Sequence, residues 1–324
     1  FDPAVPVTPL NGETDTVVQG SFPEVGPNGE IYVVWEEGWP GFSERSIRIR
    51  RSDDGGLTFP GPDEVVSSSV DASGTIELCG DGFRETLPGS IRSQEFPSID
   101  VDRSGGPFDG TVYAVWNSDP DGNAGPDNAD IFFSRSTDGG ASWSPPIVVN
   151  DDSTDTDQFF PFVRVTEAGT VAVMWYDRRL NGSEIDVFKA FSADGGQTFG
   201  PNVRVTDVSF PVPPINPNFD PLVANCYMAE YNHIATRGAT LYLTWGDNRN
   251  VLQTPDFPNG RPDPDVFFET EPDPGVLSLV LTPDTDSNEV GTPHTVTATL
   301  TDGLGNPVPG RAIEFTVTGA NTCL

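Results

Sequence analysis

Three segments of the chain share one pattern: Ser52-Asp-Asp-Gly-Gly-Leu-Thr-Phe59, Ser136-Thr-Asp-Gly-Gly-Ala-Ser-Trp143 and Ser192-Ala-Asp-Gly-Gly-Gln-Thr-Phe199. Each copy follows a run that alternates like a β-strand. A carboxylate, a glycine and a hydroxyl at fixed offsets are typical of a turn that hydrogen-bonds to itself. In such a turn the aspartate accepts backbone N–H groups and the glycine adopts positive φ. The residues expected to build these turns are Ser52, Asp54, Gly56, Ser136, Asp138, Gly140, Ser192, Asp194 and Gly196.

The repeated unit is larger than the turn. Four units open with related segments and continue with a strand-like run that ends in tryptophan; a third run precedes the turn and a short fourth run follows it. Four strands per unit, separated by turn signals, predict the blades of a β-propeller. The opening segments are Phe22-Pro-Glu-Val, Phe96-Pro-Ser-Ile, Phe160-Pro-Phe-Val and Tyr231-Asn-His-Ile, and the tryptophans, expected in the core, are Trp35, Trp116, Trp175 and Trp245.

The three turns resemble the Asp boxes, or bacterial neuraminidase repeats, of sialidase-like β-propellers. The resemblance implies an all-β fold in which residues 1–273 form radial, four-stranded antiparallel blades. Four blades are visible in the sequence, whereas sialidase-like propellers have six. It also implies that the Asp boxes are structural and indicate a fold, not an activity.

The first eight residues repeat an outer strand: Phe1-Asp-Pro-Ala-Val-Pro-Val-Thr8 matches Phe199-Gly-Pro-Asn-Val-Arg-Val-Thr206. Two interpretations follow. Val5 and Val7 could pair with Val266–Glu269 and close a ring of four blades, which would protect an open sheet edge. Alternatively, further blades precede the segment in a longer protein.

Residues 274–324 have a different character. The segment Thr295-Val-Thr-Ala-Thr-Leu-Thr-Asp302, followed by Gly305-Asn-Pro-Val-Pro-Gly310, resembles bacterial Ig-like domains of the invasin type. Such sandwiches need about 100 residues, roughly twice the length present here. We therefore expect an incomplete Ig-like β-sandwich.

Charge and cysteine content limit the function. Asp and Glu outnumber Lys and Arg by 49 to 17, for a net charge of −32. This charge argues against nucleic acid and anionic membranes as partners, and no apolar run has the length of a membrane span. Cys79, Cys226 and Cys323 form neither a zinc pattern nor a disulfide framework. Cys79 and Cys226 could pair or remain separate buried thiols.

The long connections, including 67–95, 117–130, 207–230 and 246–264, are all assigned to the upper face, which we therefore expect to be functional. Two similar segments, Trp175-Tyr-Asp-Arg-Arg179 and Trp245-Gly-Asp-Asn-Arg249, end second strands there. Arginines beside acids and aromatics could hold a carboxylated sugar; the alternative is an Asp–Arg network between blades. The candidate ligand-binding residues are Asp177, Arg178, Arg179, Asp247, Arg249, Glu230, Tyr227 and Tyr231.

Acidic loops suggest calcium as a candidate cofactor, although neither loop fits the EF-hand pattern. The candidate ligands are Asp119, Asp121, Asp151 and Asp155. Solvated acidic loops are the alternative. No other cofactor is indicated.

The function expected from these features is binding or adhesion at the cell surface or outside the cell, with a glycan or extracellular polymer as partner. A sialidase-like exo-glycosidase is the first alternative, but the F/Y-R-I-P segment and a Tyr–Glu nucleophile pair of that family are not recognisable. A structural subunit that self-assembles through the Ig-like domain is the second.

Overall fold

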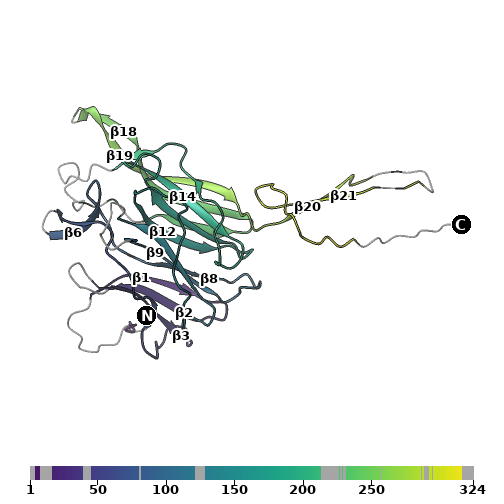
Figure 1. The fold of residues 1–324 in the computed structure, drawn as a ribbon, viewed down its shortest axis with the longest axis horizontal. Coiled ribbons are helices and arrows are strands. Elements are labelled where there is room, and N and C mark those ends of the chain that lie inside the picture. The colour runs from purple at the N-terminus through teal and green to yellow at the C-terminus, as the bar shows by residue number, and fades with distance from the viewer. Residues whose placement is uncertain are drawn as a thin grey trace.

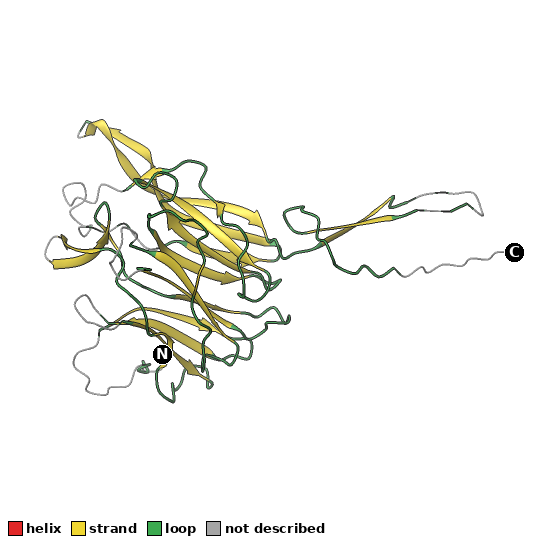
Figure 2. Ribbon diagram, viewed as in Figure 1, coloured by secondary structure: helices red, strands yellow, loops and turns green. Residues whose placement is uncertain are grey.

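The computed structural model describes residues 4–7, 17–38, 45–79, 82–120, 128–212, 226, 228, 231–255, 257–285, 287, 292–293 and 295–315. These residues form strands, turns and loops, and no helix occurs among them (Figure 2). The described part of the chain accordingly has no helix that is long and apolar enough to cross a membrane. The all-β class predicted from the sequence is confirmed.

Three antiparallel blades follow one another along the chain, each in strand order from the axis outward. The first contains β1 (Val18–Val25), β2 (Ile31–Glu37), β3 (Ser46–Ser52) and β4 (Glu64–Ser67). The second contains β8 (Ser98–Val101), β9 (Val112–Ser118), β10 (Asp130–Ser136) and β11 (Ile147–Val148). The third contains β12 (Gln158–Val165), β13 (Val171–Asp177), β14 (Glu184–Ser192) and β15 (Val203–Arg204), and β16 (Phe210–Pro211) also pairs with β14.

The fourth blade has three strands among the described residues: β17 (His233–Arg237), β18 (Thr240–Thr254) and β19 (Phe257–Pro272). The blades form a fan that runs from the first blade, beside the N-terminus, to β18 and β19 at the other end (Figure 1). The predicted four-bladed closure is wrong. Residues 4–7 form no strand, and the carbonyl of Val7 accepts a hydrogen bond from Arg50 Nη1 on β3 at 2.8 Å.

The open edge of the fourth blade leaves apolar side chains in solvent. Val266 is 81% and Phe268 is 63% exposed on β19. Ile131 and Phe133 occupy the corresponding register positions of the second blade and are buried. Burial of this face therefore depends on a following blade, which the fourth sheet lacks in the described residues.

The four tryptophans of the repeat occupy equivalent, buried positions near the middle of each second strand. Their partners on the third strands are in one register: Trp35 faces Arg48, Trp116 faces Phe132, Trp175 faces Phe188 and Trp245 faces Phe267. The predicted core role of the tryptophans is confirmed.

The three repeated turns have one hydrogen-bond pattern. In the first, Gly56 N donates to Ser52 Oγ at 2.9 Å, and Thr58 N and Oγ1 donate to Asp54 at 2.9 and 2.6 Å. The same bonds recur from Gly140 and Ser142 and from Gly196 and Thr198. Both glycines of each turn have positive φ, so the turn needs two glycines where the sequence analysis assigned this role to one.

The long connection between the first two blades folds into a small sheet of β5 (Thr75–Cys79), β6 (Gly82–Leu87) and β7 (Ile91–Arg92). A disulfide joins Cys79 to Cys226, with a Cα–Cα distance of 5.7 Å. Arg92 N also donates to Cys226 O at 2.7 Å. The insert of one connection is thus tied to the connection that precedes the fourth blade, which decides the pairing that the sequence left open.

The C-terminal region contains one hairpin, β20 (Ser278–Thr282) and β21 (Thr297–Thr301), which extends away from the blades (Figure 1). Leu279, Val280 and Leu281 of this hairpin are exposed. The described residues include no second sheet that packs on it. The Ig-like sandwich and the boundary at residue 274 therefore stay predictions.

Loss of the disulfide should destabilise the protein strongly. The bond closes a loop of 147 residues, and removing a constraint of this kind costs about 3–5 kcal/mol of unfolding free energy. We expect Cys79→Ser to lower the guanidinium midpoint followed by circular dichroism, and reduction of the unsubstituted protein to lower it equally. A midpoint that does not change in either case would contradict the bond.

Removing the Asp54 carboxylate should destabilise the protein more than removing the carboxylate of Asp53. Asp54→Ala removes the acceptor of the Thr58 N–H and hydroxyl, whereas Asp53→Ala removes only an exposed ion pair with Arg51. Thermal unfolding should therefore show a lower Tm for Asp54→Ala than for Asp53→Ala. Equal Tm values would mean that the turn does not depend on the carboxylate.

Candidate functional site

The residues at the beginnings of the four innermost strands surround one cavity on the propeller axis. Its volume is about 360 Å³. Each blade contributes three consecutive residues, and the last of them pairs with the residue before the repeat tryptophan: these residues are Phe22, Ser98, Phe162 and His233. In the first blade the three residues begin two positions before the segment Phe22-Pro-Glu-Val, so the sequence repeat that aligned Phe22 with Phe160 is shifted there by two residues. The lining residues are Gly20, Ser21, Phe22, Phe96, Pro97, Ser98, Phe160, Pro161, Phe162, Tyr231, Asn232 and His233.

Two of these segments contain the same β-bulge. The ladder shifts between Gln19 and Phe22 in β1 and between Phe159 and Phe162 in β12. In β1 the bulge holds Gly20 at φ +62°, but in β12 the equivalent residue is Phe160 at φ +51°. A bulky side chain with positive φ is strained, by about 1–3 kcal/mol, and such residues cluster at functional sites.

Hydrogen bonds from two other blades hold the strained residue. Asn117 Oδ1 accepts from Phe160 N at 3.2 Å, and Asn232 Nδ2 donates to Phe160 O at 2.7 Å. Both asparagines are buried. The position of the Phe160 backbone at the cavity is therefore fixed by the second and fourth blades as well as its own.

The rings of the cavity contact one another across blades. Phe22 and Phe162 lie edge to face with ring centroids 5.7 Å apart, and Phe162 lies 4.3 Å from the His233 ring. Burial, and secondarily the charge of Arg164, lowers the pKa of His233. The imidazole is consequently neutral at pH 7, and the cavity presents aromatic, hydroxyl, amide and imidazole groups.

Arg164 lies on β12, two residues beyond Phe162, and lines the lower axial opening instead. Its Nη1 lies 3.3 Å from Glu24 and 3.4 Å from Asp100, and its Nε donates to Ile234 O at 3.2 Å. Arg103 binds the same two carboxylates. The acidic side chains of the innermost strands are thus engaged by guanidinium groups.

Asp177 and Arg179, predicted from the sequence, bind each other at the end of β13. Arg179 N and Nε donate to the Asp177 carboxylate at 2.8 and 2.9 Å, and Trp175 Nε1 donates to it at 2.8 Å. Arg179 also donates to Asp151 at 2.7 Å and lies over the Phe188 ring. Burial raises the pKa of Asp177, and the hydrogen bonds of Arg179 oppose this shift.

Asp247 and Arg249 repeat this arrangement in the fourth blade. Arg249 N and Nε donate to Asp247 at 2.8 and 2.9 Å, Trp245 Nε1 donates to it at 3.2 Å, and the guanidinium lies over Phe267. Arg249 also pairs with Asp207. Each motif thus binds a residue of a connection, and the alternative of an Asp–Arg network between blades stays a prediction.

The other predicted ligand residues are separated. Arg178 is buried and donates to Pro88 O at 2.6 Å and to Asp157 at 3.2 Å. Tyr231 lines the axial cavity and is largely exposed. Tyr227 and Glu230 lie outside the described residues. Of the predicted residues that the structure describes, only Tyr231 lies at the cavity, and ligand binding by the predicted set stays a prediction.

The calcium candidates are not grouped in the described part of the chain, where no set of three metal-ligating side chains occurs. Asp151 accepts hydrogen bonds from Arg179 and from Asn202 N. Asp119 lies in a connection within the second blade, and Asp155 lies in the connection between the second and third blades. Asp121 lies outside the described residues. Calcium stays a prediction.

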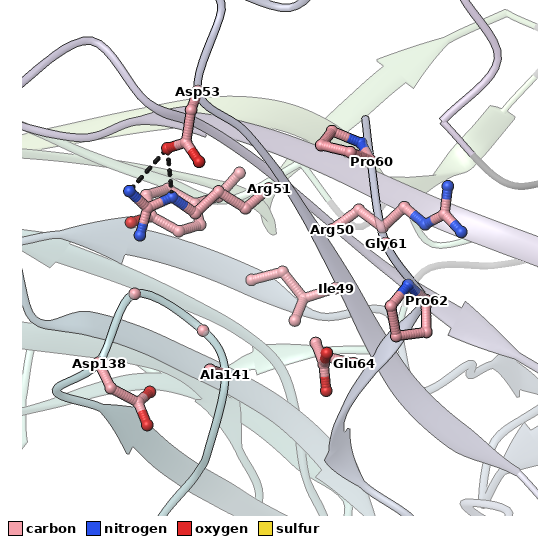
Figure 3. Close-up of a pocket in the computed structure, with 13 residues that line it drawn as sticks. Ile49, Arg50, Arg51, Asp53, Pro60, Gly61, Pro62, Glu64, Asp138 and Ala141 are labelled. Atoms are coloured by element: carbon pink, nitrogen blue, oxygen red, sulfur yellow. Dashed lines mark hydrogen bonds and ion pairs between the residues drawn. The ribbon is translucent and has the colours of Figure 1, made fainter. Parts of the chain in front are cut away.

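A second cavity of about 360 Å³ lies between the turns of the first two blades. Figure 3 shows Arg51 paired with Asp53 on one side, Ile49 in the middle and Asp138 on the facing loop. The Arg51–Asp53 hydrogen bond is 2.7 Å, and Arg50 donates to two backbone carbonyls. Because these cations already have partners within the protein, the axial cavity is the better candidate site.

A buried acidic cluster anchors the insert beside the axial cavity. Arg45 pairs with Glu36 at 3.6 Å and with Glu85 and Glu95, and all four side chains are buried. Glu95 immediately precedes Phe96 of the cavity. Burial, together with the negative charge of Glu95, raises the pKa of Glu36 to about 9. One guanidinium faces three carboxyl groups, and Glu36 is therefore protonated at neutral pH.

The lining of the axial cavity was missed in the sequence, although its signal was present. The four segments that open the repeats were identified only as strand starts. Equivalent positions on the innermost strands of a propeller must converge on the axis, so the same repeat predicts a common cavity.

Comparison with known proteins supports the fold. No protein-family model and no curated protein sequence matches the chain. Among solved structures, the NanB sialidase from Streptococcus pneumoniae matches with a TM-score of 0.50 and 10% identity, over 76% of this chain and 51% of that chain. A Hadza microbial sialidase has a TM-score of 0.44 and 18% identity, over 82% and 50% of the two chains. The GH93 α-L-arabinofuranosidase of Fusarium graminearum has a TM-score of 0.42 and 15% identity, over 92% and 77%.

The chain thus spans about half the length of these two sialidases. At this level of identity, the likeness concerns the fold. The chain has a β-propeller fold.

Removing the buried acid at Glu36 should change how stability depends on pH. The folded state keeps a proton on Glu36 that the unfolded chain releases above about pH 4.5. The stability that the protonated side chain contributes is therefore fully present below that pH and is lost as pH rises through about 9. Relative to the unsubstituted protein, Glu36→Gln should gain at least about 1 kcal/mol of unfolding free energy between pH 5 and 9. Urea unfolding at several pH values measures this.

The matched control is Glu37→Gln, because Glu37 is the next residue and its side chain is partly exposed. Its stability difference from the unsubstituted protein should stay constant over the same pH range. A constant difference for Glu36→Gln as well would contradict a protonated Glu36.

Proposed function

We propose that the protein is a carbohydrate-binding module and that the axial cavity is its binding site. The observation that carries the proposal is the strained Phe160, held at the cavity by hydrogen bonds from two other blades. Strain of this kind persists only where the surroundings enforce it, and it is common at binding sites. A β-bulge next to it aims the side chains of β12.

The size and composition of the cavity support this proposal. Its volume lies in the range of small-molecule sites, of which mostly apolar walls with a few polar groups are typical. Aromatic rings offer flat apolar surfaces for the C–H face of a sugar ring. Ser21, Tyr231 and His233 add hydroxyl and imidazole groups that can exchange hydrogen bonds with sugar hydroxyls.

The fold and the disulfide support the wider part of the proposal. The matching structures are named sialidases and an arabinofuranosidase, proteins that act on carbohydrates. Disulfides persist in oxidising compartments, so the Cys79–Cys226 bond supports a location outside the cell or at its surface. We favour binding over hydrolysis because the described acids near the cavity have cationic partners: Glu24 and Asp100 pair with Arg103 and Arg164, and the acidic cluster beside the cavity surrounds Arg45.

Replacing Phe160 tests the site. Phe160→Gly removes the ring, and glycine tolerates positive φ, as Gly20 does at the same point of β1. We expect the affinity for oligosaccharides, measured by isothermal titration calorimetry, to fall by about tenfold or more. Reducing-sugar release in the same samples distinguishes binding from hydrolysis.

The control is Phe268→Ala, which removes an exposed ring on the outer face of the fourth blade. It should leave affinity unchanged. Equal affinities for both variants and the unsubstituted protein would place the carbohydrate site elsewhere, and absence of binding to any oligosaccharide tested would reject the function.

A further inference from the structure

We infer that the axial cavity selects uncharged sugar residues and excludes carboxylated ones, such as uronic or sialic acids. This inference rests on the proposed function and names the ligand class of the same site. It differs from the expectation that arginines on the upper face would hold a carboxylated sugar.

No charged side chain lines the cavity among the described residues. Among the described lining residues, His233 is the one ionisable base, and partial burial beside the charge of Arg164 lowers the pKa of its imidazole, so the neutral form predominates at pH 7. A carboxylate entering the cavity would lose hydration without gaining a cationic partner, which is costly in an aromatic environment. The uncharged hydroxyls of a neutral sugar carry no such penalty.

The arginines closest to the axis are compensated. Arg164 and Arg103 share Glu24 and Asp100, so two positive charges face two negative charges. The Nε of Arg164 is also occupied by Ile234 O, and its guanidinium lies 5.6 Å from the centroid of the Phe162 ring. Moving Arg164 to a ligand carboxylate would leave Asp100, which is buried, with less compensation.

The arginines of the upper face are compensated in the same way. Arg179 is held by Asp177 and Asp151, and Arg249 by Asp247 and Asp207. Each guanidinium also lies over a phenylalanine ring of its own blade, at 4.5 Å from the centroid. These contacts leave neither Arg179 nor Arg249 prepared for bidentate binding of a ligand carboxylate.

The net charge of −32 would repel a carboxylated sugar from any part of the surface, so the local and the global effect must be separated. Salt makes this separation possible. At 1 M NaCl the Debye length falls to about 3 Å, which screens the field of the whole protein but not the loss of hydration inside the cavity. Selectivity that comes from the cavity therefore persists at high salt.

The test uses pairs of a neutral and a carboxylated sugar. Two pairs differ by a carboxylate on each residue, β-1,4-mannotetraose with β-1,4-tetramannuronate and α-1,4-galactotetraose with α-1,4-tetragalacturonate, and in the third lactose is compared with 3′-sialyllactose, which carries an added sialic acid. Calorimetry on the full chain at pH 7, in 0.15 and 1 M NaCl, measures both members of each pair. We expect at least one neutral member to bind, with at least about tenfold higher affinity than its charged partner at both salt concentrations.

A matched pair of variants tests whether the cavity is responsible. His233→Arg places a cation in the lining, whereas Ala235→Arg adds the same charge two residues further along β17, at the lower axial opening. We expect His233→Arg to reduce the preference for the neutral sugar by about tenfold, and Ala235→Arg to leave it unchanged. Circular dichroism establishes that both variants are folded, and the comparison of sugar pairs on the unsubstituted protein does not depend on either.

The outcomes separate the two proposals. Tighter or equal binding of the charged members, loss of the preference in 1 M NaCl, or equal effects of the two arginine variants would overturn the inference while leaving carbohydrate binding in place. Absence of binding to every member of the three pairs would reject the proposed function, and the inference with it.

Discussion

Arg164 contacts all three of the other innermost strands, and the arrangement of the blades around the axis depends on it. From β12 it reaches Glu24 on β1, Asp100 on β8 and the carbonyl of Ile234 on β17. Neighbouring blades also pack face to face through apolar clusters, and Arg164 adds the polar contacts that join all four at the axis. Because Asp100 also accepts from Val165 N, this buried carboxylate serves both the backbone of β12 and its arginine. The apolar contact between Phe22 and Phe162 lies on the upper side of the same network.

The aromatic cavity and the ionic network occupy successive levels of the axis. Phe162 and Arg164 are two residues apart on β12, so their side chains lie on the same face of the strand. The upper level collects aromatic rings and neutral polar groups, and the lower level collects the paired charges. This separation leaves the cavity uncharged in a strongly acidic protein, and it is the physical basis of the ligand class that we infer.

The insert between the first two blades adds a second constraint on the upper face. The disulfide to Cys226 and the ion pairs of Arg45 hold it on two sides, and Leu87 and Ile91 pack into the core that contains Phe160 and Tyr176. Glu95, which pairs with Arg45 in the buried cluster, directly precedes Phe96 of the cavity lining. The segments around the cavity are thus fixed by covalent, ionic and apolar contacts from sequence-distant parts of the chain.

The sequence by itself determined the blades, because their signals are local. A serine, an aspartate and two glycines within five residues fix each turn, and alternation that leads to a tryptophan marks each second strand. The tertiary structure decided the site, because its chemistry depends on which side chains meet. In the sequence, Asp177 and Arg179 have the pattern of a ligand-binding motif. In the structure their spacing lets them bind each other, and the Arg179 guanidinium also lies over the Phe188 ring of the facing strand. Likewise, no local pattern shows that Cys79 meets Cys226, that Val7 lies at Arg50 and not at β19, or that four strand openings enclose one cavity, since each depends on how separate blades are placed around the axis.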